Sequence, residues 1–171
     1  RTLDAASERQ LTRRRAAKML LLLCGTGTLG WTLARQAPWA EWNASHKTAT
    51  GERRTIALAD GGSIWLNTAS AVDVDYDAQQ RRIRLHRGEI LIQTAHDTHR
   101  PPRPLVVDTV HGRMHALGTR FSVLRQEAGT QVAVFEGAVE LQPQAAGTPA
   151  LILQAGEQSL RSSHGASAPS P

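Results

Sequence analysis

The sequence predicts an all-β domain of about ten short strands, a β-sandwich or roll, preceded by one N-terminal transmembrane helix. Three observations support this prediction. From about residue 50 onward, short runs of alternating apolar and polar residues replace any helical periodicity. These runs end at glycines or Asp-Gly pairs, which are typical of turns between strands. Closer to the N-terminus, residues 19–34 include no charged residue.

Charge and composition exclude several classes of protein. The 171-residue chain has a formal net charge of +5, yet residues 1–41 hold seven Lys or Arg against three Asp or Glu, and the remainder is nearly neutral. A nucleic-acid-binding domain would carry its positive charge on the folded part, so no nucleic acid is expected as a partner. The single cysteine excludes an intrachain disulfide framework and a cysteine-rich zinc site.

The charge-free segment predicts a membrane anchor. We assign residues 1–15 to the cytoplasm and residues 16–35 to a transmembrane helix, whose apolar run spans roughly 24 Å of a ~30 Å hydrocarbon core. Lys18 and Arg35 can extend their charged ends to the headgroups. Basic residues precede the run, so the protein is expected to cross the inner membrane once, with its main domain in the periplasm. The anchor residues are Lys18, Met19, Leu20, Leu21, Leu22, Leu23 and Trp31.

The same segment resembles an export signal. Arg13, Arg14 and Lys18 fit a twin-arginine pattern. A retained anchor, a cleaved signal peptide and a lipoprotein signal ending at Cys24 are alternatives, and twin-arginine export is compatible with retention. A buried core helix is a further alternative, but the run of four leucines would make such a helix apolar on every face.

The rest of the chain divides by composition. Residues 36–49 contain Pro38 and small polar residues and are expected to form a juxtamembrane linker. Residues 50–161 carry the strand patterns and form the predicted periplasmic β-domain. Residues 162–171, which read SSHGASAPSP, are expected to form a flexible tail.

Individual strands follow from local patterns. Thr55–Leu58 and Ser63–Asn67 flank Asp60-Gly61-Gly62 and are expected to form a hairpin. In residues 72–77, aliphatic or aromatic side chains alternate with aspartates, which predicts one buried and one solvated face. Glycines at the ends of later runs are expected to turn the chain between adjacent strands; the main ones are Gly88, Gly118 and Gly137.

Two patterns resemble metal sites. Asp73, Asp75 and Asp77 match the start of a calcium-binding loop, but Ala78 and Arg84 occupy the positions where that loop requires Gly and Glu. An exposed strand face explains the aspartates better.

His111 and His115 have the spacing of zinc ligands on a helix, but Gly112 and the neighbouring strand pattern argue against a helix. The sequence also lacks a phosphate-binding loop, a nucleophile elbow and a dinucleotide-binding fingerprint. We therefore expect no metal, no cofactor and no turnover enzyme.

Seven short blocks nevertheless resemble, in order, the FecR family of transmembrane regulators of extracytoplasmic-function sigma factors. Each block alone is weak, but seven in order are specific. They are Gly51-Glu52-Arg53-Arg54, Leu58-Ala59-Asp60-Gly61, Leu66-Asn67-Thr68-Ala69-Ser70, Leu85-His86-Arg87-Gly88-Glu89, Ala116-Leu117-Gly118-Thr119-Arg120-Phe121, Glu136-Gly137-Ala138-Val139 and Ala155-Gly156-Glu157.

The resemblance implies a relay across three compartments. An iron-siderophore binds an outer-membrane TonB-dependent transporter, whose signalling domain contacts the regulator, which controls a cytoplasmic sigma factor as anti-sigma factor, activator or both. Residues 1–15 are then the remnant of a sigma-binding region. The alternative is a FecR-like β-module that acts as a structural or cell-envelope binding domain without a sigma partner.

The resemblance also implies a candidate self-cleavage bond, Gly118-Thr119. The Thr119 hydroxyl would attack the Gly118 carbonyl in an N→O acyl shift, and water would open the resulting ester. His115 or His111 are the candidate bases. The alternative is a structural turn glycine followed by a β-branched strand residue.

Overall fold

The computed structural model describes residues 43–142, 150–162 and 165–170. The predictions for residues 1–35, which include the anchor and the export signal, lie outside these ranges. The described residues form strands, turns and loops without a helix, so the all-β prediction is confirmed for them. Within these ranges there is accordingly no helix long and apolar enough to cross a membrane.

Thirteen strands are present in the described residues. They are β1 (His46–Lys47), β2 (Arg54–Ala57), β3 (Ser63–Leu66), β4 (Ala71–Tyr76), β5 (Arg81–Gln93), β6 (Leu105–Thr109), β7 (Gly112–Ala116), β8 (Arg120–Arg125), β9 (Thr130–Glu136), β10 (Ala138–Gln142), β11 (Leu151–Gln154), β12 (Gln158–Ser162) and β13 (Gly165–Ala166). All neighbours are antiparallel except β5 and β6, which are parallel.

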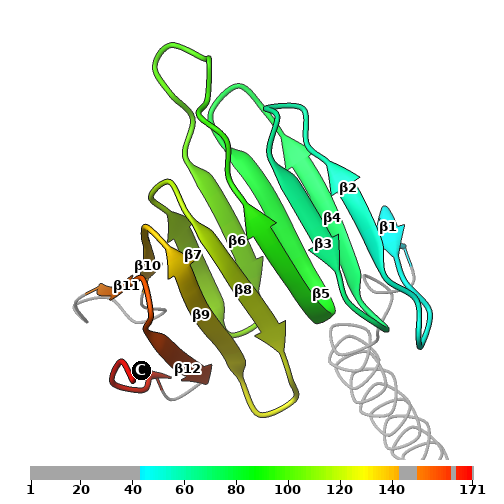
Figure 1. The fold of residues 1–171 in the computed structure, drawn as a ribbon, viewed down its shortest axis with the longest axis vertical. Coiled ribbons are helices and arrows are strands. Elements are labelled where there is room, and N and C mark those ends of the chain that lie inside the picture. Colours follow the sequence, from blue (N-terminus) through cyan, green and yellow to red (C-terminus); the bar gives the residue numbers. More distant parts are fainter. Residues whose placement is uncertain (1–42, 143–149, 163–164, 171) are drawn as a thin grey trace, which may run out of the picture. The chain divides into compact units, whose positions relative to one another are not determined.

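The long strand β5 joins two sheets (Figure 1). Its first part pairs with β4 and β6 in sheet A, which also contains β1, β7, β10 and β11. Its last part pairs with β3 and β8 in sheet B, which also contains β2, β9, β12 and β13. Two crossings between the sheets matter below. One leads from β3 in sheet B to β4 in sheet A, and the other leads from β7 in sheet A to β8 in sheet B.

The core is one apolar cluster that contains residues of both sheets. Inward positions alternate with outward ones along each strand, as a period of two requires. From sheet B the cluster includes Ile64, Leu66, Ile90, Ile92, Phe121, Val123, Val132 and Val134, and from sheet A it includes Val72, Ile83, Leu85, Val107, Met114, Val139 and Leu141. Val74 packs at its edge and is only half-buried.

The predicted first hairpin is confirmed, because β2 and β3 pair around the Asp60-Gly61 turn. The expectation for Gly88 is wrong. Gly88 lies inside β5 rather than between two strands, at φ +82, and a Cβ there would overlap Ser70. The glycine is needed for close packing against a distant turn, which a local turn signal does not reveal.

Both ends of the β-domain differ from the predicted boundaries. Thr48 is buried and β1 pairs with β4, so the domain includes part of the expected linker. At the other end, the expected flexible tail contains β13, and Ser170 exchanges two backbone hydrogen bonds with Gln158. The Ser159 hydroxyl donates to the Ser167 carbonyl at 2.8 Å, which ties this polar segment to β12.

Candidate functional site

The candidate bond lies where the chain crosses from sheet A to sheet B. β7 ends at Ala116, β8 begins at Arg120, and residues 117–119 make the crossing. Leu117 N–H donates to the Ala138 carbonyl at 3.0 Å. Gly118 is exposed at φ +83, a conformation that glycine adopts without steric cost. Thr119, by contrast, is 5% exposed, so the bond joins a surface glycine to a buried threonine.

Thr94, which follows β5, holds Thr119 through three hydrogen bonds. Its backbone N–H donates to the Thr119 carbonyl at 3.0 Å, and its hydroxyl donates to the same oxygen at 3.1 Å. In return, Thr119 N–H, the amide nitrogen of the candidate bond, donates to the Thr94 hydroxyl oxygen at 2.8 Å. We call residues 117–119 together with Thr94 the Thr94 corner.

The side-chain hydroxyl of Thr119 is in a different state. Its Oγ1 atom is buried and has no hydrogen-bond partner among the described residues. Buried hydroxyls are normally hydrogen-bonded, because desolvation without a partner costs on the order of 1–3 kcal/mol. On the other side of the bond, Gly137 packs against the Gly118 carbonyl so closely that a Cβ on Gly137 would overlap that oxygen.

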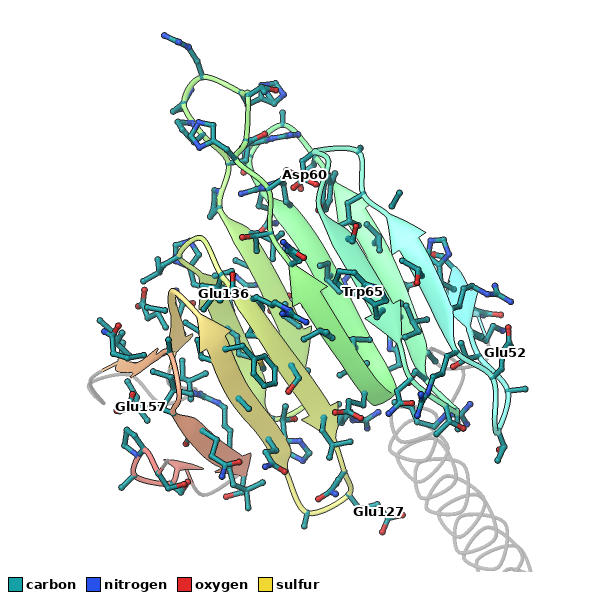
Figure 2. The ribbon with its side chains drawn as sticks, viewed as in Figure 1. Glu52, Asp60, Trp65, Glu127, Glu136 and Glu157 are labelled. Carbon is teal, nitrogen blue, oxygen red and sulfur yellow. The ribbon has the colours of Figure 1, made fainter. Side chains whose placement is uncertain are left out.

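A cleft of about 440 Å³ opens at this corner. Its lining comes from both ends of β5, the 94–104 loop, the end of β7, the crossing itself and the end of β9. The lining residues are Arg81, Gln93, Thr94, Ala95, His96, Asp97, Pro102, Ala116, Leu117, Gly118, Thr119 and Glu136. Figure 2 labels Glu136, at the end of β9, and Asp60, in the turn between β2 and β3.

The imidazole that lines this cleft is His96 rather than either histidine expected from the sequence. His111 Nδ1 lies 3.0 Å from the Thr130 hydroxyl, and His111 belongs to the β6–β7 turn at the far end of β7. Burial, together with the charge of Arg125, lowers the pKa of His111. His115 Nδ1 lies 3.6 Å from a carboxylate oxygen of Glu140, its cross-strand neighbour.

A buried ionic network supports the Thr94 corner. Arg81 Nη1 donates to Asp60 Oδ2 at 2.6 Å and to the Ala95 carbonyl at 3.0 Å, and the two charged side chains are 9% and 2% exposed. The Tyr76 hydroxyl donates to the same Asp60 oxygen at 3.4 Å. Burial, with the nearby Asp60 charge, raises the pKa of Tyr76 above its ordinary value.

A second ion pair closes the 94–104 loop on itself. Arg103 donates to Asp97 through its backbone N–H at 2.7 Å and through two side-chain nitrogens at 3.0 and 2.9 Å. The Arg103 side chain therefore holds the pKa of Asp97 well below its usual range. The loop that carries His96 is thus fixed at both of its ends.

A second crossing in the domain has the same backbone design. Residues 67–70 lead from β3 in sheet B to β4 in sheet A, and Thr48 holds Ser70 as Thr94 holds Thr119. Thr48 N–H donates to the Ser70 carbonyl at 3.0 Å, and Ser70 N–H donates to the Thr48 hydroxyl at 2.9 Å. The preceding residue, Ala69, also has a positive φ, of 51°. We call residues 67–70 together with Thr48 the Thr48 corner.

The remaining sequence candidates have structural contacts. Asp73 accepts hydrogen bonds from the backbone and hydroxyl of Ser45, each at 2.7 Å, and its other oxygen lies 2.7 Å from His86 Nε2. Across residues 43–142, 150–162 and 165–170, no group of three or more His, Cys, Asp or Glu is arranged to hold a metal ion. The anchor and export residues lie outside these ranges.

Sequence reasoning identified Gly118 and Thr119 but missed Thr94, His96 and the packing role of Gly137. Thr94 is separated from Thr119 by 25 residues, and neither residue marks the other by local pattern. The signal that could have found the pair is its internal repetition, because at the Thr48 corner a threonine likewise accepts from the backbone N–H of a hydroxyl-bearing residue, there Ser70.

Comparison with known proteins supports the resemblance. The chain is similar to two crystal structures, at 1.65 and 2.50 Å resolution, of a Parabacteroides distasonis protein described as a putative anti-sigma factor. The TM-scores are 0.59 and 0.58 at 22% identity, with 69% of this chain covered. The alignments cover 54% of the other chain, so this sequence matches about half of that length. No curated protein sequence matches the chain significantly.

The family assignment rests on the sequence match. The model of the FecR protein family matches residues 44–140, which is more than half of the chain and includes both corners. The start of the match at residue 44 agrees with the burial of Ala44 and Thr48 in the domain. The chain belongs to the FecR family.

Proposed function

We propose that this protein is a single-pass inner-membrane regulator, an anti-sigma factor or activator, that relays a signal from an outer-membrane TonB-dependent iron-siderophore transporter to an extracytoplasmic-function sigma factor. The observation that carries the proposal is the FecR-family match over residues 44–140. The fold shared with a protein described as a putative anti-sigma factor is consistent with it.

FecR-family proteins are non-enzymatic signalling proteins, so the expectation that the chain is not a turnover enzyme is confirmed. They are generally membrane regulators with periplasmic domains. For this chain we assign the membrane crossing to residues 16–35 and place the β-domain in the periplasm, on the strength of the basic residues that precede the apolar run.

Reporter fusions test this topology. A periplasm-dependent reporter fused after Pro171 is expected to be active, and a cytoplasm-dependent reporter at the same position is expected to be inactive. The reverse pattern contradicts the topology. Replacing Arg13 and Arg14 by lysine reduces reporter activity if the twin-arginine route is used and leaves it unchanged if the general secretion route is used.

A promoter assay tests the relay. In the native host, deletion of the gene is expected to change the iron-siderophore response of a sigma-dependent promoter, and re-expression is expected to restore it. An unchanged promoter response would favour the alternative, a β-module that binds the cell envelope without a sigma partner.

A second function, self-cleavage at Gly118-Thr119, is supported by one specific observation: the Thr119 hydroxyl is buried without a hydrogen-bond partner among the described residues. An unpaired oxygen beside the carbonyl of a surface glycine suits a nucleophile. Gly118 has no side chain to obstruct attack, and its exposure gives water access to the acyl carbon.

The proposed reaction has two steps. The Thr119 Oγ1 bonds to the Gly118 carbonyl carbon while the bond from that carbon to the Thr119 nitrogen breaks, and the hydroxyl proton passes to the nitrogen to give an ester and a free amine. Water then attacks the ester carbon and the C–O bond breaks. The products are a carboxyl group on Gly118 and a second fragment that begins with an intact Thr119.

Incubation of the purified chain tests the reaction. Wild-type protein is expected to give two fragments that meet at Thr119 without added protease, and hydroxylamine is expected to accelerate scission by trapping the ester. Thr119→Ala removes the nucleophile and is expected to stay intact, whereas Thr119→Ser and Thr119→Cys retain one and are expected to cleave. Wild-type protein that stays intact after prolonged incubation removes this proposal and leaves the relay untouched.

A further inference from the structure

We propose that Thr94 is a catalytic residue of this self-cleavage, because its hydroxyl contacts the nitrogen that must leave. The inference rests on the proposed reaction at Gly118-Thr119. It is carried by the Thr119 N–H, which donates to the Thr94 hydroxyl at 2.8 Å. Among the described residues, this is the side chain that contacts the amide of the candidate bond.

The acyl shift demands a group at that nitrogen. An amide nitrogen is a poor leaving group until it gains a proton, so attack by the Thr119 oxygen returns to starting material unless a proton is supplied. A threonine hydroxyl carries one proton and two lone pairs, so it can accept from an N–H and later donate to the same atom after rotating. Thr94 thus contacts the required atom before the reaction begins.

Thr94 gives one proton to the leaving nitrogen and regains one in the same reaction. As the Thr119 oxygen attacks, the nitrogen becomes pyramidal and its lone pair becomes available, and the Thr94 hydroxyl donates its proton there. The two hydroxyl groups are not hydrogen-bonded to each other, so the proton lost by the Thr119 hydroxyl reaches Thr94 through water in the cleft that both residues line. Thr94 ends unchanged, the nitrogen leaves as a neutral amine, and the ester joins Thr119 Oγ1 to Gly118.

Thr94 and Gly137 restrain the bond from opposite sides. The backbone N–H and the hydroxyl of Thr94 hold the Thr119 carbonyl at 3.0 and 3.1 Å, and Gly137 packs against the Gly118 carbonyl oxygen. The acyl carbon and the nucleophile therefore stay adjacent, which favours an intramolecular reaction. Thr94 therefore holds the Thr119 backbone in place and also contacts the nitrogen that has to be protonated.

The Thr48 corner provides a matched control inside the same chain. Thr48 is 3% exposed, and like Thr94 it pairs with its partner through a backbone N–H and a hydroxyl that accepts from the partner's N–H. Its hydroxyl donates to the Asn67 carbonyl at 2.6 Å and to the Ser70 carbonyl at 3.4 Å. Its loss should affect folding much as the loss of Thr94 does, but it lies far along the chain from Gly118. Thr94→Val and Thr48→Val each remove a hydroxyl and keep the branched shape.

The experiment measures cleavage rates of purified full-length chains with and without hydroxylamine, with circular dichroism and melting temperature as checks of folding. Thr94→Val is expected to slow cleavage about a hundredfold, and Thr94→Ser, which restores the hydroxyl, is expected to cleave within about threefold of wild type. Thr48→Val is expected to cleave at the wild-type rate. Hydroxylamine should not restore cleavage of Thr94→Val, because the substitution slows the acyl shift that forms the ester, and hydroxylamine acts only on the ester.

Each outcome bears on a separate claim. A folded Thr94→Val chain that cleaves like wild type overturns the role of Thr94 and leaves the cleavage proposal intact. Wild-type protein that does not cleave removes both. If Thr94→Val does not fold, Thr94→Ala is used instead, and a wild-type rate in that variant, or slow cleavage by a folded Thr94→Ser chain, overturns the inference.

Discussion

The two corners between the sheets share their backbone hydrogen bonds but differ in the state of one hydroxyl. At the Thr48 corner, the Ser70 Oγ donates to the Glu89 carbonyl at 3.0 Å and accepts from Glu89 N–H at 3.0 Å. At the Thr94 corner, the equivalent Thr119 Oγ1 is buried with no partner among the described residues. One corner is fully satisfied, and the other keeps an unpaired nucleophile next to a carbonyl.

This difference shows how a structural device can acquire chemistry. Hydrogen bonds from a threonine to the last residue of the crossing, with a residue of positive φ just before it, are sufficient to carry the chain between sheets, since the Thr48 corner does so. The Thr94 corner has three further features that the proposed reaction needs. Gly118 occupies the position that Ala69 has at the Thr48 corner, the Thr119 hydroxyl is unpaired among the described residues, and a cleft of about 440 Å³ opens beside the bond.

Support for the two corners also differs. The Thr94 corner is backed by the buried Arg81–Asp60 pair, because Arg81 also donates to the carbonyl of Ala95, next to Thr94. Near the Thr48 corner along the chain, by contrast, the Arg54–Glu52 ion pair is exposed, with 50% and 39% of the two side chains accessible to solvent. The comparison therefore predicts that loss of charge affects the Thr94 corner far more strongly.

The largest expected effect is that of Asp60→Asn. The substitution keeps an oxygen for the Gly62 N–H but leaves the Arg81 guanidinium buried without a counter-charge, which is expected to cost about 4 kcal/mol in the free energy of unfolding. Urea unfolding of the purified chain measures it. Asp75→Asn is the control, because its pair with Arg84 is exposed and should change stability by about 0.5 kcal/mol or less. Equal losses from both would contradict the buried role of Asp60.

The next effect is that of Gly137→Ala. The new Cβ would overlap the Gly118 carbonyl oxygen, and φ at this position is +73, so we expect a cost of about 3 kcal/mol. Gly156→Ala is a matched control with φ +89 and no atom within 4 Å of the new Cβ, and it should cost only about 1 kcal/mol. Thermal unfolding separates the two, and similar losses would mean that the contact with Gly118 is unimportant.

The third prediction concerns Ser70, whose hydroxyl both donates and accepts a hydrogen bond. Ser70→Ala removes the acceptor of the Glu89 N–H and the donor to its carbonyl, so it is expected to destabilise the chain by about 2 kcal/mol. The same urea titration measures this loss. A neutral result would mean that water replaces the serine and that the Thr48 corner is less constrained than its hydrogen bonds indicate.

Local patterns predict the all-β class and the first hairpin, but not the glycine inside β5 or the partners of the candidate site. Alternating residues and the Asp60-Gly61 turn predicted the β2–β3 hairpin because a hairpin is a local structure. The sequence predicts a turn at Gly88 because a strand glycine and a turn glycine have the same sequence signal. The reason for this glycine is Ser70, eighteen positions earlier, so only the three-dimensional structure identifies β5 as one strand shared by two sheets.

The candidate site was predicted in part for the same reason. A short block of sequence carried the resemblance that singled out Gly118 and Thr119. Their partners come from residues 94–97, which lie on the other side of two strands. The histidines that sequence proximity suggested belong to β7 and its preceding turn, where they contact Thr130 and Glu140 instead. Proximity in sequence selected the wrong imidazoles because a β-strand carries its residues away from the turn at about 3.3 Å per residue.

The smallest expected effect is the sharpest test of the comparison, and it is that of Thr119→Val. Valine keeps the branched shape and removes a hydroxyl that has no partner among the described residues, so the substitution is expected to leave stability unchanged or raise it by about 1 kcal/mol. Destabilisation by about 2 kcal/mol, as expected for Ser70→Ala, would mean that the Thr119 hydroxyl is hydrogen-bonded in solution. The two corners would then be equivalent, and Thr119 would not hold an unpaired nucleophile beside the Gly118 carbonyl. A stable valine variant that no longer cleaves would instead show that the hydroxyl is retained at Thr119 for its reactivity and at a cost in stability.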